Sequence, residues 1–206
     1  MTKPYGNILF DLGMVLLHID YGPAFKRAMP YFDGAVGSSP EEFFTLIGRD
    51  PSIDRYERGD ITGKEFFQHF VKKTGFRGTH DEFVGIWRDI FIENEPMIRF
   101  ARELSRKYDV YLASNASDLH IPYVLEAFPS LCFYKDAAFS YRLRATKPEP
   151  AFYERTLKQF GVTANTCLFI DDRPENVESA ELFGIRSILY TNPEETIART
   201  RKILGK

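Results

Sequence analysis

The chain has 206 residues, of which 44% are hydrophobic and 27% are charged, and its 27 basic and 29 acidic side chains give a formal net charge of −2. This composition is typical of a globular protein and excludes a collagen-like fibre, a coiled-coil rod and wholesale disorder. The balanced charge gives no general attraction to nucleic acid, and no apolar run approaches the roughly 20 residues of a membrane helix. We therefore expect a protein that binds neither nucleic acid nor membrane.

The N-terminus and the two cysteines indicate the compartment. Residues 1–6 lack the apolar segment of a signal peptide. Cys132 and Cys167 form no CxxC pair and have no metal-ligand spacing, and Cys167 opens an apolar run, where we expect a small buried residue. These features predict a reducing, cytoplasmic location, and they give no indication of the oligomeric state.

The first part of the chain holds one short apolar run and then a long helical region. Residues 8–10 are apolar and are followed by Asp11. From about residue 20 to residue 92 the sequence contains no convincing strand and is rich in Phe, so we interpret it as a helical insertion with Trp87 in its own core. Helices are expected over about 22–32, 40–48, 63–74 and 80–92. Three of them begin with capping-box pairs, namely Ser39–Glu42, Thr62–Glu65 and Thr79–Glu82.

The second part of the chain alternates apolar runs with helical patterns. Continuous apolar runs of three to five residues are typical of strands that are buried on both faces of a parallel sheet. We predict an α/β fold, in which a doubly wound, Rossmann-like core of residues 1–19 and 93–206 carries an inserted all-helical domain of residues 20–92. The further strands are expected at residues 110–113, 137–139, 168–170 and 187–190.

Polar residues directly follow three of these runs, namely Asp11, Ser114 and Asp171. Each alone is also a common turn or cap residue. The carboxyl ends of parallel strands meet at one sheet edge, so we expect Asp11, Asp171 and the adjacent Asp172 to lie close together. Because such carboxylates repel one another unless a cation lies between them, and because oxygen ligands favour a hard ion, the pattern predicts bound Mg²⁺.

Two further residues indicate a phosphate beside this metal. Lys147 precedes a Pro and a predicted helix start, where a cation and a helix N-terminus suit a phosphate dianion. Asn115 adds amide donors beside Ser114. The sequence thus predicts a Mg²⁺ and phosphate site in which a carboxylate is available as a nucleophile.

Four segments, residues 10–16, 112–115, 146–150 and 169–176, resemble in this order the four motifs of the haloacid dehalogenase superfamily of hydrolases. The spacing of 24 residues between Lys147 and Asp171 also matches that superfamily. The resemblance covers essentially the whole chain, and the helical insertion is similar to the C1 cap that closes over the active site. The resemblance implies that Asp11 is the nucleophile that forms an aspartyl-phosphate and that it also binds Mg²⁺. It implies that Ser114 and Asn115 hold the phosphate oxygens and that Lys147 offsets the charge of Asp11 and phosphate. It further implies that Asp172, with Asp171 beside it, and the backbone carbonyl of Gly13 hold the metal, and of the two acids Asp172 is favoured as the direct ligand.

Gly13 departs from the family pattern. Most phosphatases of the superfamily carry an Asp there, whose general acid–base assistance is worth about 10²–10⁴-fold. With glycine at this position, the motifs of the chain resemble those of a bacterial branch of the superfamily that is similar to glucose-1-phosphate phosphatases. We therefore expect either an activated substrate, such as a sugar 1-phosphate or an acyl phosphate, or a proton donor elsewhere, for which His18 is the nearest candidate. The charged segment 55–58, before the Gly59–Asp60 turn, is a candidate for presenting insertion side chains to the site.

The predicted function is that of a Mg²⁺-dependent phosphatase that hydrolyses a small phosphorylated metabolite. Two alternatives remain open. A phosphate-binding or regulatory protein would keep the site but have weak turnover, because it lacks an acid at Gly13. A 2-haloacid dehalogenase of the superfamily would usually have Tyr at that position and would need no metal. The sequence alone does not identify the substrate.

Overall fold

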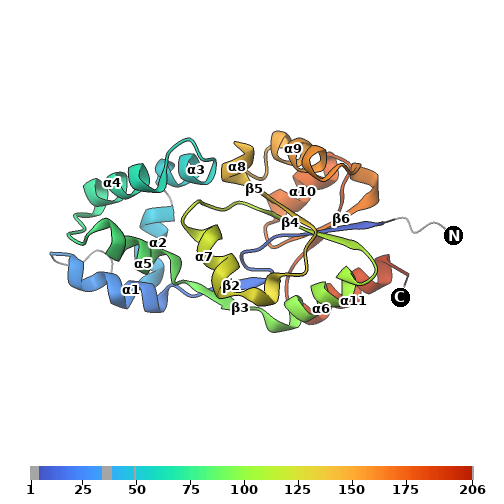
Figure 1. Ribbon diagram of the computed structural model, residues 1–206, viewed down its shortest axis with the longest axis horizontal. Coiled ribbons are helices and arrows are strands. Elements are labelled where there is room, and N and C mark those ends of the chain that lie inside the picture. The colour runs from blue at the N-terminus through green and yellow to red at the C-terminus, as the bar shows by residue number, and fades with distance from the viewer. Residues whose placement is uncertain (1–4, 34–38, 49, 206) are drawn as a thin grey trace.

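The computed structural model describes residues 5–33, 39–48 and 50–205. Its centre is a sheet of five parallel strands in the order β5–β4–β1–β6–β7 (Figure 1). In register, Phe10 of β1 lies between Leu112 of β4 and Ile170 of β6. The doubly wound α/β fold is confirmed, and the five predicted apolar runs all form strands: β1 (Asn7–Phe10), β4 (Asp109–Ser114), β5 (Asp136–Phe139), β6 (Cys167–Asp171) and β7 (Arg186–Leu189).

Alternate side chains of the central strands build two hydrophobic layers. In β1, Ile8 and Phe10 join the layer that contains α6, α7 and α11, whereas Leu9 joins the layer that contains α9 and α10. These helix groups lie on opposite faces of the sheet (Figure 1). Because both faces are covered, the strands are continuously apolar. The helices and turns are α6 (Glu95–Ser105), α7 (His120–Ala127), η2 (Pro129–Leu131), α8 (Ser140–Leu143), α9 (Pro150–Phe160), η3 (Ala164–Thr166), α10 (Pro174–Leu182) and α11 (Pro193–Ile203).

The region between β1 and α6 forms the helical group on the left of Figure 1. Two short antiparallel strands, β2 (Leu17–Ile19) and β3 (Phe91–Glu93), join it to the core. These strands were not predicted, because three residues are too few to show a period. Between them lie α1 (Gly22–Ala28), η1 (Met29–Tyr31), α2 (Pro40–Gly48), α3 (Pro51–Glu57), α4 (Gly63–Thr74) and α5 (His80–Arg88).

The helices of this region differ from the expected set in three places. The segment expected over 22–32 forms α1, which ends at Ala28, and then the 3-10 turn η1. Helix α3 was not predicted, although Pro51 stands at its first position and the Asp50 side chain accepts a hydrogen bond from the Ser52 amide. The segment expected over 80–92 ends at Arg88, where the chain turns into β3. The predicted capping boxes of Thr62–Glu65 and Thr79–Glu82 are both present. At the third predicted pair, the Ser39 hydroxyl accepts a hydrogen bond from the Glu42 amide at 3.2 Å.

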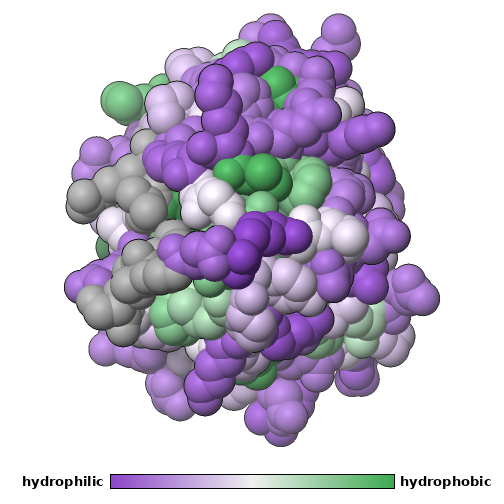
Figure 2. All heavy atoms as spheres, turned by 90° about the vertical axis from the view of Figure 1, so that its left-hand side faces the viewer, coloured by the Kyte–Doolittle hydropathy of each residue, from purple (hydrophilic) through white to green (hydrophobic). Residues whose placement is uncertain are grey.

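The inserted helices enclose a hydrophobic cluster separate from the layers of the sheet. Phe83 is nearly inaccessible and packs against a group of aromatic rings. Trp87 stacks on Phe83 with ring centroids 5.4 Å apart, as the predicted insertion core requires. The outer face of this region is mostly hydrophilic (Figure 2). The aromatic side chains therefore hold the helices together from inside, and the other rings around Phe83 are those of Phe66, Phe67, Phe70 and Phe76.

Two further sequence-based expectations concern the environment of the chain. Cys167 is fully buried, as expected, and both cysteines are free thiols. Across the described ranges, no helix combines the length and apolar character needed to cross a membrane.

Candidate active site

The strand ends bring the predicted acidic residues together. Asp11 follows β1 directly, and Asp171 is the last residue of the adjacent β6. One carboxylate oxygen each of Asp11, Asp171 and Asp172 lie within 4.8 Å of one another. Ser114 ends β4 on the other side of β1 and is buried. The parallel sheet therefore gathers these side chains at one edge.

Lys147 lies inside this cluster, and its ammonium group has three acceptors. Its Nζ donates to Asp171 Oδ2 at 2.6 Å and to the backbone oxygen of Ala113 at 3.1 Å, and it lies 2.9 Å from Asp11 Oδ1. An ammonium group has three protons, so these contacts saturate it. A phosphate oxygen would have to replace one of these acceptors to bind Lys147 directly.

Burial and charge shift the pKa of both partners. Burial raises the pKa of Asp11 to about 7, although Lys147 lowers it, and the charge of Asp171 raises it further. Burial alone would lower the pKa of Lys147, but the charges of Asp11 and Asp171 raise it overall. The three carboxyl groups thus share one buried cation, which leaves uncompensated negative charge at the site.

The two acidic residues of the β6 end have different environments. Asp171 is fully buried, and its Oδ1 accepts hydrogen bonds from the Arg173 amide at 2.9 Å and from Asn176 Nδ2 at 2.8 Å. With Lys147 on Oδ2, both oxygens of Asp171 have partners. Asp172 is half-buried, and its carboxylate makes no hydrogen bond to another residue in the described part of the chain. Of the pair, Asp172 therefore has oxygens available for a ligand.

The Asn115 side chain is hydrogen-bonded to the backbone of the loop that carries Lys147. Its Oδ1 accepts a hydrogen bond from the Lys147 amide at 2.8 Å, and its Nδ2 donates to the Lys147 carbonyl at 3.1 Å. The amide group thus positions the lysine, while its predicted contact with phosphate stays a prediction. Ser114 Oγ donates to the Asn115 carbonyl at 3.2 Å, and the hydroxyl lies close enough to Asp11 to lower the pKa of that carboxyl group.

A cavity of about 240 Å³ opens beside this cluster, between the core and the inserted helices. Gly13, Ser114 and Asn115 line its inner end. A Cβ added to Gly13 would lie 3.7 Å from Ile19 Cδ1, an ordinary contact, so the cavity has room for a side chain at that position. The rest of the wall is mainly apolar: Leu12, Ile19, Tyr21, Ile47, Ile53, Trp87, Ile90, Phe91, Ala116, Ile121 and Val124.

Three ionisable residues in this wall, Glu57, His120 and Tyr21, were not predicted as site residues. Glu57, at the end of α3, lines this cavity and also a second one that contains Asn115, Lys147 and Arg173. Its place within the charged segment 55–58 was the only indication in the sequence. His120, the first residue of α7, lines the main cavity, and its ring stacks on Trp87.

The expectation for His18 is wrong. Its side chain is exposed and does not line the described cavities beside the acidic cluster. The reason is the alternation of side chains along β2, in which Ile19 faces the cavity and His18 faces solvent. A strand that was not predicted could not tell these two orientations apart.

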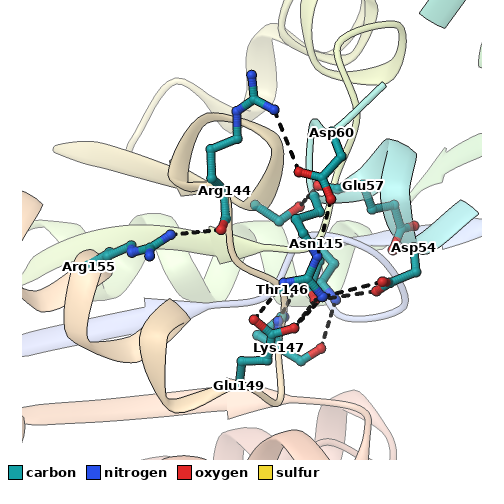
Figure 3. A network of polar contacts seen from close by, with 11 residues as sticks. Asp54, Glu57, Asp60, Asn115, Arg144, Thr146, Lys147, Glu149 and Arg155 are labelled. Carbon is teal, nitrogen blue, oxygen red and sulfur yellow. Dashed lines mark hydrogen bonds and ion pairs between the residues drawn. The ribbon is translucent and has the colours of Figure 1, made fainter. Parts of the chain in front are cut away.

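A polar network fixes α3 to the core above the site (Figure 3). Arg58 Nη1 donates to Glu149 Oε2 at 2.7 Å, its Nη2 donates to Glu149 Oε1, and it also reaches Thr146 Oγ1 at 3.3 Å. On the following turn, Arg144 pairs with Asp60 at 3.7 Å. The loop that carries Lys147 is thereby joined to the inserted helices.

The family model described as haloacid dehalogenase-like hydrolase matches residues 7–184. The chain belongs to this family. Two similar proteins are the D-ribitol-5-phosphate phosphatase of Bacteroides thetaiotaomicron, 25% identical over 90% of this chain and 92% of that protein, and a sesquiterpene phosphatase of Aspergillus oryzae, 27% identical over the full length of both.

Solved structures of haloacid dehalogenase enzymes share the fold. A HAD family enzyme from B. thetaiotaomicron superposes with a TM-score of 0.78 at 25% identity, covering 92% of this chain and 95% of that one. The same enzyme crystallised with magnesium and inorganic phosphate gives a TM-score of 0.77 at 22% identity, over 91% and 94% of the two chains. A predicted hydrolase from Porphyromonas gingivalis gives 0.79 at 23% identity, over 98% and 99%.

Proposed function

We propose that this haloacid dehalogenase-like hydrolase is a Mg²⁺-dependent phosphatase that hydrolyses a small phosphate monoester. The observation that carries the proposal is the cluster of Asp11, Asp171 and Asp172 around the buried ammonium of Lys147. Relatives named as phosphatases, and a similar enzyme crystallised with magnesium and phosphate, support it.

Each residue of the cluster has a distinct proposed role. Asp11, whose carboxylate is oriented by Lys147 and by the Leu12 amide at 2.7 Å, attacks phosphorus and forms an aspartyl-phosphate. Ser114 binds a phosphate oxygen, and Asn115 holds the loop of Lys147 and adds a donor at the same edge. Lys147 offsets the charge of Asp11 and of the phosphate.

The donor set suits Mg²⁺. Oxygen ligands alone, two of them carboxylates, are what this ion takes when it also binds water and a phosphate. We propose Asp11, Asp172 and the Gly13 carbonyl as its protein ligands, with Asp171 holding Lys147 beside them. Bound Mg²⁺ would offset the charge of the carboxylates and polarise the phosphoryl group.

We propose the inserted region, residues 20–92, as a C1 cap that covers the site. It contributes most of the apolar wall of the main cavity, through residues such as Ile47, Ile53 and Trp87. A cover of this kind excludes water from the reacting phosphate and selects the leaving group.

The apolar wall bears on the substrate class. A sugar 1-phosphate remains a prediction, yet a free sugar offers a hydroxyl on almost every carbon, and the wall beyond Gly13 and Ser114 supplies few polar partners. The named substrates of the relatives include a polyol phosphate and a sesquiterpene phosphate. We propose a phosphate monoester with a partly apolar leaving group, which buries its apolar part against Ile53, Trp87 and Ile121.

The test is a phosphate-release screen with the purified full chain. Sugar, polyol, acyl, alkyl and prenyl phosphates are offered with Mg²⁺ and with a chelator, to the wild type and to Asp11→Asn. We expect Mg²⁺-dependent release that Asp11→Asn abolishes, with kcat/KM higher for alkyl or prenyl than for sugar phosphates. Higher kcat/KM for sugar phosphates would support the original prediction instead.

The alternatives give different results in the same assay. Release of halide from 2-haloacids that is insensitive to the chelator would indicate a dehalogenase. Tight binding of phosphate without turnover of any ester would indicate the phosphate-binding protein, the alternative that Gly13 favours.

A further inference from the structure

The proposed phosphatase lacks a proton donor at the position where its relatives usually have one. Gly13 lines the main cavity but has no side chain to protonate a leaving oxygen. An alkoxide is a poor leaving group, so an ester with an aliphatic alcohol needs an acid from elsewhere in the site. The inference below rests on the proposed phosphatase function.

We propose that Glu57 is the general acid that protonates the leaving oxygen, and the general base of the second step. Glu57 lines the main cavity together with Gly13 and Ser114, and it lines the second cavity together with Lys147 and Arg173. It therefore belongs to the part of the cavity wall that the inserted helices supply, whereas Gly13 and Ser114 belong to the part that the core supplies. If Asp11 attacks phosphorus from the core, an in-line displacement directs the leaving group toward the inserted helices.

The backbone of Glu57 is anchored to the core. Ser140 Oγ donates to the Glu57 carbonyl at 2.6 Å and accepts from the Ala116 amide at 2.9 Å. A hydroxyl that follows β5 thus ties the end of α3 to the loop after β4. The flanking residues are bonded to the core as well, Tyr56 OH to Asp118 Oδ1 at 2.7 Å and Arg58 Nη1 to Glu149 Oε2 at 2.7 Å.

The carboxyl group of Glu57, by contrast, is available. It has no hydrogen-bond or ion-pair partner among residues 5–33, 39–48 and 50–205. The charged and titratable groups facing it are Asp54 on its own helix, Tyr21 from the start of α1, and Arg173 and Lys147 from the core.

Its environment favours the protonated form. Burial raises the pKa of Glu57 to about 7; Arg173 opposes this shift, Asp54 adds to it, and Lys147 opposes it. A phosphate dianion bound in the cavity adds negative charge and so favours the protonated acid further. A pKa near the working pH is the condition under which one group can act first as acid and then as base.

The other candidates in the cavity wall fit this role less well. Burial lowers the pKa of His120 to about 4, and the ring nitrogen Nε2, 3.1 Å from the Trp87 carbonyl, must carry its proton toward that oxygen. The neutral ring then has no second proton to give. Burial raises the pKa of Tyr21 above its ordinary value, which makes its phenol a weaker acid.

The two steps balance with Glu57 as the only proton carrier. In the first, Asp11 forms a bond to phosphorus, the P–O bond to the alcohol breaks, and the Glu57 proton goes to the leaving oxygen. In the second, water attacks the phosphorus of the aspartyl-phosphate and gives its proton to Glu57. The products are the alcohol and hydrogen phosphate, and both carboxyl groups return to their starting states.

The experiment compares two esters that differ in their need for an acid. n-Hexyl phosphate has an alkoxide leaving group, whereas p-nitrophenyl phosphate leaves as a stabilised anion. We expect Glu57→Gln to lower kcat/KM for hexyl phosphate by about 10²–10⁴-fold and for p-nitrophenyl phosphate by less than about tenfold. Asp81→Asn, which removes a fully exposed charge from the inserted helices, should keep the wild-type ratio of the two substrates.

Two further readouts separate an acid from a structural residue. With hexyl phosphate and saturating Mg²⁺, which favours ionised Asp11, wild-type kcat/KM should fall as the pH rises above about 7, where free Glu57 loses its proton. Glu57→Gln should lack this fall. Adding Gly13→Asp to Glu57→Gln should restore hexyl phosphate activity, because the cavity has room for that side chain.

Three outcomes would contradict the proposal. Equal loss on both esters, or survival of the alkaline fall in Glu57→Gln, would overturn the role of Glu57 while leaving the Asp11-dependent phosphatase intact. A wild type that hydrolyses neither ester, and that equals Asp11→Asn, would overturn both the role of Glu57 and the proposed function.

Discussion

Lys147 is the residue on which the charge balance of the site depends. Its side chain is 1% exposed and holds two carboxylates whose mutual repulsion it offsets. Removing one member of a buried charge cluster leaves the others uncompensated in a low dielectric.

We therefore predict that Lys147→Met lowers the free energy of unfolding by about 3–5 kcal/mol. Because the remaining site is more negative, added Mg²⁺ should raise the Tm of the variant more than that of the wild type. Chemical and thermal denaturation with and without Mg²⁺ measure both effects. Lys135→Met is the control: this lysine, 59% exposed and paired with Asp109, should change stability by less than about 1 kcal/mol.

The sequence predicted the residues at the strand ends, because their placement needs only the apolar runs and the geometry of a parallel sheet. Asp11 and Asp171 come together in this way, and so does Ser114. Glu57 could not be predicted in the same way. It belongs to an inserted helix, and its orientation depends on packing between that helix and loops that are distant in sequence.

At the scale of elements, the core was more predictable than the insertion for a related reason. Each core strand has both faces buried, so its apolar run is continuous and visible in the sequence. Helix α3 has seven residues, and only Ser52 and Tyr56 of it are buried, which leaves almost no period to detect. The strands β2 and β3 are shorter still, although β2 decides that Ile19 rather than His18 faces the cavity.

Helix α3 is also the element that joins the inserted helices to the Lys147 loop. Arg58 directly follows Glu57 in the sequence, and its guanidinium group donates hydrogen bonds to both carboxylate oxygens of Glu149. Since the two side chains of this pair are 25% and 37% exposed, its contribution to global stability is small. Its effect should instead be local, on the last turn of α3.

We predict that Arg58→Met accelerates amide hydrogen exchange at residues 58–60 by about tenfold, the equivalent of about 1.4 kcal/mol of local stability. The Tm should change little. Exchange measured by mass spectrometry or NMR reports this directly. Arg27→Met is the control. It removes the exposed ion pair between Arg27 and Asp89 within the inserted region and should leave amide exchange at residues 58–60 unchanged. Unaltered exchange in Arg58→Met would mean that α3 is held by its apolar contacts alone.

At the scale of the whole molecule, the protein has two hydrophobic centres that differ in independence. The sheet with its two helical layers is the larger. The inserted helices have their own aromatic cluster but are only about 60–70 residues long, a size at which a core is marginal by itself. The stability of the inserted helices should therefore depend on the sheet domain more than the stability of the sheet domain depends on them.

The single tryptophan makes this asymmetry measurable, because Trp87 lies in the smaller cluster. Phe83→Ala removes the ring on which Trp87 stacks and should cost about 3–5 kcal/mol. We predict that its tryptophan fluorescence changes at a lower denaturant concentration than its far-UV circular dichroism, since the sheet domain remains folded when the cluster opens. Phe152 of α9 is as buried as Phe83 and packs against the sheet. Phe152→Ala should therefore destabilise the sheet domain, and the aromatic cluster should unfold together with it. Its two transitions should coincide, and coincident transitions in both variants would instead indicate one cooperative unit.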